Sequence, residues 1–490
     1  MNIFLSKTKI KQNHQCEKQL WLELTNPKLG KFDDSTKSVF DQGRKVESLM
    51  HDYFKSKFKI IREVKSFKNK DKIEETKKYL NEGAEVIFEA SFLYQGTIIQ
   101  FDALVKKDNG SFFAVEVKSS TSQKPDHVID MTIQYWVASA EIKLEEYYLY
   151  FVNKKSKSLN PEEYFEKINL IKDLIENKNL FDQMLNSSIK TSNEKSEPQN
   201  KVGKHCSDPY KCKFWDYCFS KINQSYDSPL NLPNFKKGFE AINNGIISVL
   251  SEEFIKTYPD YVLKYPLIMS AISTNSLKIN HSAILAELSK LTYPLAFFDF
   301  ETVMSAFPIF PEQTPYQQVV VQFSSHLLTE KNELTHSEFL WDKKEDPSRS
   351  VAEAIVLNLK NAGSIISYNK TFEKTQIANL AQKFPDLKED LDKINSRFYD
   401  LLDLVKAHVY HPSFKGSYSL KEVSPALLGE KGNYSDSIIK NGNQISSYFL
   451  QYINLRGEEK EKIGNSLKKY CFHDTLNLYL LFNFLKEYKV

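Results

Sequence analysis

The sequence has few cysteines and no long apolar run. Only 5 of its 490 residues are cysteine, so we expect no disulfide framework, and clustered thiols in such a chain more often bind metal. No stretch reaches the roughly 18 uninterrupted apolar residues of a membrane helix, and the N-terminal residues turn polar too early for a secretory signal. We therefore expect a cytoplasmic protein without membrane contact.

The chain also has little net charge. A formal charge of +3 argues neither for nor against nucleic acid as a partner, so any basic groove must be local. What it has in quantity is apolar and aromatic side chains, 41% and 13% of residues, which suffice for more than one core.

Compositional breaks divide the chain into three parts. A polar, loop-like run covers residues 186–204, and a Pro-rich break precedes a helical-looking stretch. Near Leu291 an apolar, strand-like segment begins a new part of the chain, and strand-like and helix-like segments alternate after it. We predict an α/β protein with an N-terminal module over 1–225, a helical connector over 226–290 and a C-terminal module over 291–490.

The first group of candidate residues lies on a predicted hairpin. TIIQFDALVKK and SFFAVEVKSS are strand-like and are separated by the turn residues DNG. Glu116 and Lys118 are two apart and so share one face of a strand, opposite Asp102. Asp102 and Glu116 suit a hard divalent cation, and Lys118 suits developing negative charge in phosphodiester hydrolysis. The alternative is an exposed hairpin with a cross-strand ion pair.

These residues resemble the PD-(D/E)XK nuclease superfamily, whose pattern is D, then E-x-K, on neighbouring strands. The following DMTIQYW resembles the glutamine motif of its RecB branch, with Asp130 and Gln134 one helical turn apart. The RecB pattern has tyrosine four residues after the glutamine, whereas this chain has Ala138 there and Tyr135 beside Gln134. The resemblance implies catalytic or DNA-contacting roles for Gln134 and Tyr135.

An upstream segment, FDQGRKVESLMHDYF, resembles the opening helix of the same family. That helix often carries a histidine metal ligand four residues after a glycine. Here Glu47 holds this position after Gly43, and His51 follows one turn later on the same face. Both are candidate metal neighbours, and a surface role is the alternative for each.

The second group is formed by cysteines. Cys206, Cys212 and Cys218 are spaced C-x5-C-x5-C, and Cys16 lies far upstream. Zinc sites favour shorter knuckles, whereas thiolates from distant segments are typical of iron–sulfur ligation, so the spacing favours a cluster over zinc. Cys471 is left over and is predicted to be a core residue.

One remote N-terminal cysteine plus three C-terminal ones around a RecB-like core resembles the CRISPR-associated RecB-like exonucleases and the AddB-type nuclease domain. The resemblance implies that Cys16, Cys206, Cys212 and Cys218 hold a [4Fe-4S] cluster, with zinc as the alternative. The cluster would then act chiefly as a structural staple between the two ends of the module.

The third group consists of carboxylates near the C-terminus. FFDFET places Asp299 and Glu301 on one face of an apolar strand, and Glu373 follows a second strand-like run. Tyr470 and Asp474 are four apart on a predicted helix and share a face. Four such carboxylates suit two Mg²⁺ or Mn²⁺ ions, with Tyr470 orienting a water.

This order resembles the DnaQ-like exonucleases of the DEDD superfamily, in their tyrosine subtype, on a ribonuclease-H-like fold. The histidine subtype needs a histidine where this chain has Lys469. The family has aspartate in its second motif, where this chain has Glu373, which puts full activity in question. Asp400 and Asp403 follow nearby, and Asp403 is an alternative ligand or a structural group.

The C-terminal sequence from about Pro294 onward also resembles an uncharacterised bacterial domain family that is often joined to a RecB-like module. Together these resemblances imply a metal-dependent nuclease, an exonuclease on DNA ends or single strands in repair, recombination or defence. DNA is favoured over RNA as partner. The alternatives are a nucleic-acid-binding protein with one or both modules inactive, and an iron–sulfur redox sensor.

Overall fold

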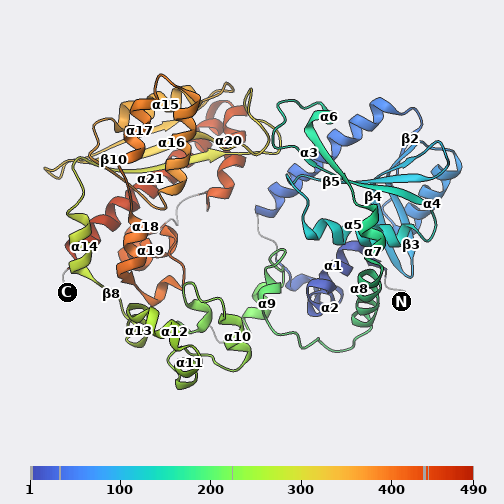
Figure 1. The fold of residues 1–490 in the computed structure, drawn as a ribbon, viewed down its shortest axis with the longest axis horizontal. Helices are drawn as coiled ribbons and strands as arrows, with labels where there is room; N and C mark the ends of the chain where they lie inside the picture. Colours follow the sequence, from blue (N-terminus) through green and yellow to red (C-terminus); the bar gives the residue numbers. More distant parts are fainter. Residues whose placement is uncertain (1–3, 32–34, 223–224, 434–437, 440, 489–490) are drawn as a thin grey trace. The chain divides into compact units, whose positions relative to one another are not determined.

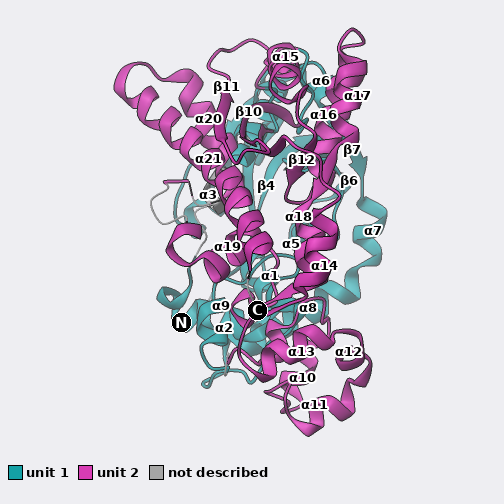
Figure 2. Ribbon diagram, turned by 90° about the vertical axis from the view of Figure 1, so that its left-hand side faces the viewer, with its two compact units in different colours: residues 1–222, 305–308, 312–317 teal, residues 223–304, 309–311, 318–490 magenta. Residues whose placement is uncertain are grey.

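The computed structural model describes residues 4–31, 35–222, 225–433, 438–439 and 441–488. The chain forms two compact units, coloured separately in Figure 2. Unit 1 consists of residues 1–222, 305–308 and 312–317, and unit 2 of residues 223–304, 309–311 and 318–490. Both units combine helices with a β-sheet, so the expected α/β class is confirmed at this level.

Unit 1 is built on a seven-stranded mixed sheet (Figure 1). The hairpin predicted from the sequence is present as antiparallel β4 and β5, and β5 pairs in parallel with β6. The strands are β1 (Leu5–Ser6), β2 (Ile61–Glu63), β3 (Val86–Tyr94), β4 (Thr97–Lys106), β5 (Phe112–Lys118), β6 (Leu144–Val152) and β7 (Phe165–Asn169). Their order is β2-β3-β4-β5-β6-β7, with β1 beside β4.

Helices of unit 1 pack on the sheet through two apolar cores. One core includes residues of α1, α5 and α8, and the other includes residues of α3. The helices are α1 (Lys7–Gln15), α2 (Glu17–Thr25), α3 (Ser35–Lys57), α4 (Asn69–Asn81), α5 (Pro125–Ala138), α6 (Pro161–Tyr164), α7 (Ile171–Glu176), α8 (Lys178–Ser192) and α9 (Trp215–Phe219). Ser6 caps α1 by accepting the Lys9 amide at 3.3 Å, and Pro125 begins α5 where its missing N–H costs nothing.

The prediction that residues 186–204 form a loop is wrong for its first part. Helix α8 continues to Ser192 and buries Ser188 and Thr191. Small hydroxyl side chains are accepted there because α8 packs closely on α1 and α2, and the Asn13 amide donates to the Ser187 hydroxyl at 2.9 Å. Polar composition alone therefore did not mark the end of the helix.

Unit 2 is built on a five-stranded mixed sheet. Its central strand β9 is antiparallel to β10 and parallel to β12. The strands are β9 (Leu295–Val303), β10 (Val319–Leu328), β11 (Leu334–Leu340), β12 (Ser364–Ser367) and β13 (Phe398–Asp400), in the order β11-β10-β9-β12-β13. Short strands β8 (Lys278–Ile279) and β14 (Val409–Tyr410) pair separately.

The side chains of β9 alternate between two cores. Phe298 and Phe300 belong to the core that α15, α16 and α17 complete, whereas Leu295 and Phe297 face the core that contains residues of α14, α18 and α21. Asp299 continues the second face, because it has the same parity as Phe297. The alternation of side chains along β9 therefore places the Asp299 carboxylate on the same face as the apolar side chains of Leu295 and Phe297.

Residues 226–290, predicted as a helical connector, contain short helices and strand β8, and they contribute to the core of unit 2 through Phe254, Ile268 and Ile284. The helices of the unit are α10 (Gly238–Asn243), α11 (Glu252–Thr257), α12 (Pro259–Lys264), α13 (Pro266–Ser273), α14 (His281–Leu288), α15 (Ser348–Leu359), α16 (Thr371–Lys383), α17 (Lys388–Ser396), α18 (Leu401–His408), α19 (Leu420–Leu428), α20 (Ile445–Asn454) and α21 (Gly457–Glu487). Among the helices of the described residues, none is both long and apolar enough to cross a membrane.

Candidate metal centres

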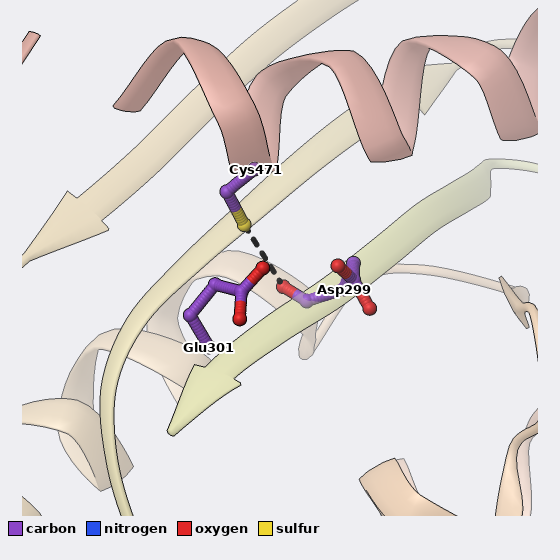
Figure 3. Close-up of side chains that lie close together, drawn as sticks. All are labelled: Asp299, Glu301 and Cys471. Atoms are coloured by element: carbon purple, nitrogen blue, oxygen red, sulfur yellow. Dashed lines mark hydrogen bonds between the residues drawn. The ribbon is translucent and has the colours of Figure 1, made fainter. Parts of the chain in front are cut away.

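The carboxylates predicted in the C-terminal part converge in unit 2. Asp299 and Glu301 lie on β9, Glu373 lies in the first turn of α16, and Asp474 lies on α21. Figure 3 shows the thiol of Cys471, on α21, pointing at the backbone carbonyl of Asp299 beside the Glu301 carboxylate. One ligand atom from each of Asp299, Glu301 and Cys471 lies within 4.8 Å of the other two. The group is therefore small enough to surround a cation.

The electrostatics of this cluster are unfavourable without a cation. Burial, followed by the negative charges of Asp474, Glu301 and Glu373, raises the pKa of Asp299 well above its usual range. Burial and Asp474 do the same to the pKa of Glu301, and burial raises the pKa of Glu373 to about 8. The Oε2 atom of Glu373 is also buried without a hydrogen-bond partner among the described residues. A divalent cation would relieve both costs, so the donor set fits one.

A lysine that the sequence analysis did not single out lies beside this cluster. The Lys421 ammonium, on α19, donates to the Tyr470 hydroxyl at 2.8 Å and lies 4.7 Å from the centre of its ring. Burial lowers the pKa of Lys421, although the negative charges of Asp474, Glu301 and Asp299 oppose that shift. Tyr470 is itself buried, at 4% exposure. The sequence position of Lys421 bears no regular spacing to the predicted carboxylates. The only sequence signal for it was the motif SYSLK, which ends at Lys421.

A buried polar network fixes α21 against the sheet. The Thr475 hydroxyl lies 2.7 Å from that of Ser324 and 2.9 Å from Nδ1 of His326, both on β10. Burial lowers the pKa of His326 to about 4, so this imidazole is neutral at neutral pH. The Gln322 amide donates to the Leu467 carbonyl at 2.9 Å. These contacts flank Tyr470 along α21 and place the face that Tyr470 and Asp474 share over β9.

Other residues near this cluster have structural roles. Asp400 caps α18 and accepts the amides of Asn369, Lys370 and Leu402, each at 3.0 Å. The alternative ligand Asp403 is exposed on α18 and belongs to none of the candidate metal groups of the described residues. Cys471 is fully buried, as predicted for a core residue, and its thiol points to the Asp299 carbonyl at 3.8 Å.

The residues predicted on the N-terminal hairpin also lie together, in unit 1. The Lys118 ammonium donates to Oε1 of Glu116 at 2.6 Å, and Asp102 accepts the Val117 amide at 2.6 Å. Glu116 is almost fully buried, at 1% exposure. Lys118 and Lys7 outweigh the cost of that burial and hold the pKa of Glu116 at about 2. This is an internal site and not an exposed cross-strand ion pair.

Helix α5 supplies the contacts expected from its one-turn spacing. Asp130 accepts from Lys118 at 3.0 Å, and the Gln134 amide donates to Oε2 of Glu116 at 2.8 Å. Gln134 is completely buried, and its carbonyl accepts from the Tyr147 hydroxyl at 2.9 Å. Tyr135 packs into the apolar core. Gln134 thus orients Glu116 inside unit 1, and the roles toward a nucleic acid that the resemblance implies for Gln134 and Tyr135 stay predictions.

A second carboxylate group in unit 1 consists of Glu47, Glu89 and Asp102. Burial and neighbouring acids raise the pKa of Glu47 and of Glu89 to about 7, and that of Asp102 well above its usual range. His51 lies 3.8 Å from Glu47 and stacks on Phe88 at 3.8 Å between ring centres. The three acids fit a divalent cation for the same reason as those in unit 2.

Glu89 was not predicted, and its backbone explains why. Its φ of 57° is unusual for a residue inside a strand. Phe88 belongs to one core of unit 1 and Ala90 to the other, so strand alternation slips at Glu89. Strict period-two spacing does not foresee this turn of the side chain. An isolated acid within the apolar strand VIFEASFLY was the available signal.

Two lysines of α1 complete the unit 1 site and were also missed. Lys7 donates to Oε1 of Glu116 at 3.1 Å, the same oxygen that Lys118 contacts. Lys11 lies 2.9 Å from Asp130 and 2.8 Å from Asp126. Their partners are more than one hundred residues away, so sequence spacing carries no signal for them.

The four predicted cysteines line one cavity of unit 1. Cys16, Cys206, Cys212 and Cys218 share its wall with aromatic side chains that include Phe214 and Trp215. All four are free thiols. Burial raises the pKa of Cys16 and Cys218, and that of Cys212 to about 11, with further contributions from neighbouring cysteines. Ionised thiols there need a positive partner, so the donor set fits a metal centre.

Comparison with known proteins leads to uncharacterised relatives. The model of a family described as "Domain of unknown function (DUF2779)" matches residues 296–419, which include Asp299, Glu301 and Glu373 but end before Tyr470 and Asp474. Uncharacterized protein MG366 of Mycoplasma genitalium is 25% identical over 221 residues, which are 41% of this chain and 33% of that protein. Uncharacterized protein UU173 of Ureaplasma parvum is 23% identical over 271 residues, 50% of this chain and 38% of that protein.

The chain thus spans between about a third and two fifths of the length of these curated relatives. Among solved structures, the crystal structure of SSO0001 is similar over 45% of this chain and 87% of that one, at 13% identity. Its TM-score is 0.24, from which no common fold follows. The family match agrees with the expected resemblance of the C-terminal part to an uncharacterised domain family.

Proposed function

We propose that this chain is a metal-dependent nuclease with one hydrolytic centre in each unit, acting on DNA ends or single strands. The observation that carries the proposal is the convergence in unit 2 of carboxylates from β9, α16 and α21 beside a buried tyrosine. Buried acids that raise one another's pKa are expensive to maintain, and they are typical of sites that use the charge. Phosphodiester hydrolysis on hard cations is the reaction that such a set serves best.

In unit 2, Asp299, Glu301, Glu373 and Asp474 would hold Mg²⁺ or Mn²⁺, as the resemblance to DEDD exonucleases on a ribonuclease-H-like fold implies. The cations would polarise the phosphoryl oxygen and stabilise the attacking and leaving oxygens. An ammonium group can only donate, so the Tyr470 oxygen accepts from Lys421 and its own hydrogen must point elsewhere. In this proposal Tyr470 would help to orient a water beside the carboxylates, as the resemblance implies.

In unit 1, we propose a PD-(D/E)XK-type centre of the RecB branch. Glu47, Glu89 and Asp102 offer a cation three carboxylates, and Glu116 stands beside them. The Lys118 ammonium, fixed by Glu116 and Asp130, would offset negative charge that develops on a phosphate. His51, which contacts Glu47, is a further neighbour of this cation site.

The cysteine set is proposed to hold a [4Fe-4S] cluster, with zinc as the alternative. Supporting this are four free thiols on one cavity wall and their wide spacing in the sequence. Cys16 and the other three come from the two ends of unit 1, so a shared metal centre would join those ends. We assign it a structural role in this proposal.

The test is a cleavage assay with anaerobically purified full-length protein on labelled single-stranded DNA and RNA, in Mn²⁺ or Mg²⁺. Wild type is compared with Lys118→Met, Asp299→Asn and the double variant. Lys106→Met, on an exposed residue of β4, and Asp403→Asn, on the surface of α18, are matched controls. Each site variant should remove a distinct part of the cleavage, and the double variant all of it.

Each other result has a definite meaning. If wild type binds DNA but never cuts it, the chain is a nucleic-acid-binding protein and the proposal is wrong. If only Asp299→Asn has an effect, unit 1 is inactive, and if only Lys118→Met has an effect, unit 2 is. Equal loss in the two control variants would indicate damage to the fold instead of to a site.

A further inference from the structure

Helix α1 reaches the unit 1 acid site with its first two turns. Lys7, its first residue, contacts Glu116 at 3.1 Å, and Lys11 contacts Asp130 at 2.9 Å. The spacing of four residues places both lysines on one helix face. Lys9, on a different face, donates only weakly to the Phe4 carbonyl at 3.4 Å. The helix therefore presents a cationic face to the acids.

The other end of α1 reaches the cysteine cavity. Cys16 is the C-terminal cap of the helix, with its amide bonded to the Gln12 carbonyl at 2.9 Å, and its thiol lines the cavity. The Gln15 amide donates to the carbonyls of His205 and Tyr210 at 2.6 and 2.8 Å. Nine residues span about 13.5 Å of helix. One short rigid element thus joins the two sites.

A second connection runs through the loop between Cys206 and Cys212. Tyr210 in this loop interacts with Asp126, which together with burial raises the pKa of Tyr210. Asp126 is also the partner of Lys11 at 2.8 Å. The cysteine-bearing loop and α1 therefore converge on the same acidic residue at the end of α5.

We propose that α1 is a positioning element of the unit 1 site, with Lys7 and Lys11 as positioning residues and the cysteine set as the anchor of the helix. The proposal rests on the nuclease function proposed for unit 1. Lys7 and Lys118 hold one oxygen of Glu116 between two ammonium groups, which fixes the orientation of that carboxylate. The contact with Glu116 in turn fixes the Lys118 ammonium relative to the cation site proposed in unit 1.

Charge gives Lys7 a signature that a purely structural residue lacks. The positive charge of Lys7 disfavours the binding of a metal cation near Asp102 and Glu116, because like charges repel strongly in a partly buried site. Lys7→Met should therefore bind Mn²⁺ more tightly, by about tenfold, while cutting DNA more slowly. Residues that only stabilise the fold would weaken binding and cleavage together.

The experiment uses the full chain carrying Asp299→Asn and Glu301→Gln, so that Mn²⁺ bound by unit 2 is suppressed. Mn²⁺ affinity, followed by electron paramagnetic resonance, and single-stranded DNA cleavage are measured for Lys7→Met, Lys7→Arg and Lys9→Met. We expect the split only in Lys7→Met, recovery of most cleavage in Lys7→Arg, and parent behaviour in Lys9→Met. Lys7→Met that matches its parent in both measurements overturns the role of Lys7.

Lys118→Met in the same background separates this proposal from the proposed function. If Lys118→Met cuts as its parent does, the unit 1 nuclease itself is wrong. If it loses cleavage while Lys7→Met keeps it and binds Mn²⁺ normally, only the α1 proposal fails.

The anchor is tested by hydrogen exchange on wild type before and after metal is stripped from the cysteines with chelator. Amides of α1 should exchange at least about tenfold faster in stripped protein, whereas those of α4, which shares no residue with the cavity, should be unchanged. Equal α1 exchange in the two forms overturns the anchoring role. Faster exchange in α1 and α4 alike would mean general unfolding and would also overturn it.

Discussion

The two acid clusters of this molecule balance their charge in opposite ways. In unit 1, Lys7 and Lys118 hold the pKa of Glu116 at about 2, and Lys7, Lys118 and Lys11 lower that of Asp130, although burial acts the other way on both. In unit 2, burial and mutual repulsion raise the pKa of Asp299 and of the acids around it. The nearby Lys421 donates to the Tyr470 hydroxyl and lowers the pKa of Glu301, but the pKa of Glu301 stays well above its usual range.

This difference teaches that similar sets of carboxylates can depend very differently on a cation. In unit 1, lysine side chains lower the pKa values of Glu116 and Asp130, whereas the carboxylates of Glu47, Glu89 and Asp102 have raised pKa values. In unit 2 the pKa values of Asp299 and Glu301 are both raised well above their usual range. We expect its structure and activity to respond more steeply to metal and pH.

The largest effect is expected at Glu373, a buried carboxylate of the unit 2 cluster. Glu373→Gln removes a carboxylate that interacts with Asp299 and could bind a cation, so the Asp299-dependent cleavage should fall by about 100- to 1,000-fold. Glu373→Asp keeps the charge on a shorter arm and should lose less. The readout is the rate of single-strand cleavage in a Lys118→Met background, which isolates unit 2.

Asp403→Asn is the control for that series, because Asp403 is an exposed acid on α18. It should cleave within about twofold of its parent. If Glu373→Gln retains its activity and Asp403→Asn loses it, the ligand of unit 2 has been misassigned and the contrast drawn between the clusters fails.

Next in size is the dependence of unit 2 stability on pH in the absence of metal. Glu373 has a folded pKa of about 8 against an ordinary value of 4.5, so the native state binds more protons between these pH values. Stability from this group must then fall as pH rises through that window. Mn²⁺ at about one hundred times its dissociation constant should restore about 2.7 kcal/mol at high pH. Hydrogen exchange of β9 and α21 measures this locally.

Unit 1 should show a different profile. Glu47 and Glu89, with pKa values of about 7, lose stability as pH rises from about 4.5 to 7, whereas Glu116 loses it as pH falls from about 4.5 towards 2. The two windows oppose each other, so β5 should be most stable at intermediate pH. Equal pH slopes in β5 and β9 would contradict the proposed contrast in charge balance.

A smaller effect is expected at Lys421. Replacing it with methionine removes the Lys421 donor to the Tyr470 hydroxyl and should slow unit 2 cleavage about tenfold. Tyr470→Phe should have a similar effect, and the double variant little more than either. Additive losses, measured as turnover at saturating DNA, would show that the two residues act separately. Lys421→Arg, which keeps a donor, should recover part of the rate.

Much of each site followed from local spacing in the sequence. The β9 pair, the shared face of Tyr470 and Asp474, and the pairing of Asp130 with Gln134 on α5 all depend on strand or helix periods. The four cysteines that were predicted to act together also line one cavity. They could be predicted as a set because the chain has few other cysteines.

What spacing missed depends on long-range packing or on unusual backbone. Lys7 reaches Glu116 across 109 positions of sequence, which no local pattern records. Glu89 joins its site because its left-handed conformation breaks the strand period. Helix α8 extends into the polar segment expected as a loop, as far as Ser192, because its small side chains suit a close helix contact. Lys7 and Lys11 were missed because their acid partners are distant in the sequence, whereas Lys118 was predicted because it lies two residues from Glu116.

The smallest effect expected lies behind Glu116, where a neutral hydrogen bond supports the charged ones. Tyr147 donates to the carbonyl of Gln134 at 2.9 Å, which fixes that amide so that its nitrogen faces Glu116. Tyr147→Phe leaves a buried acceptor unpaired, so unit 1 should lose about 1 kcal/mol of stability. Cleavage dependent on Lys118 should fall by about twofold to threefold, since a rotated amide would turn its oxygen to the carboxylate.

Tyr94→Phe is the matched control for this change, because the Tyr94 hydroxyl is reached only by the exposed Gln95 side chain at 3.1 Å among the contacts described for it. It should alter stability by less than about 0.5 kcal/mol. Denaturant unfolding followed at unit 1, together with cleavage in the Asp299→Asn background, measures both effects. If Tyr147→Phe destabilises unit 1 but leaves cleavage unchanged, Lys7 and Lys118 alone orient Glu116. The neutral side chains of Gln134 and Tyr147 would then make no contribution to the charge balance of unit 1.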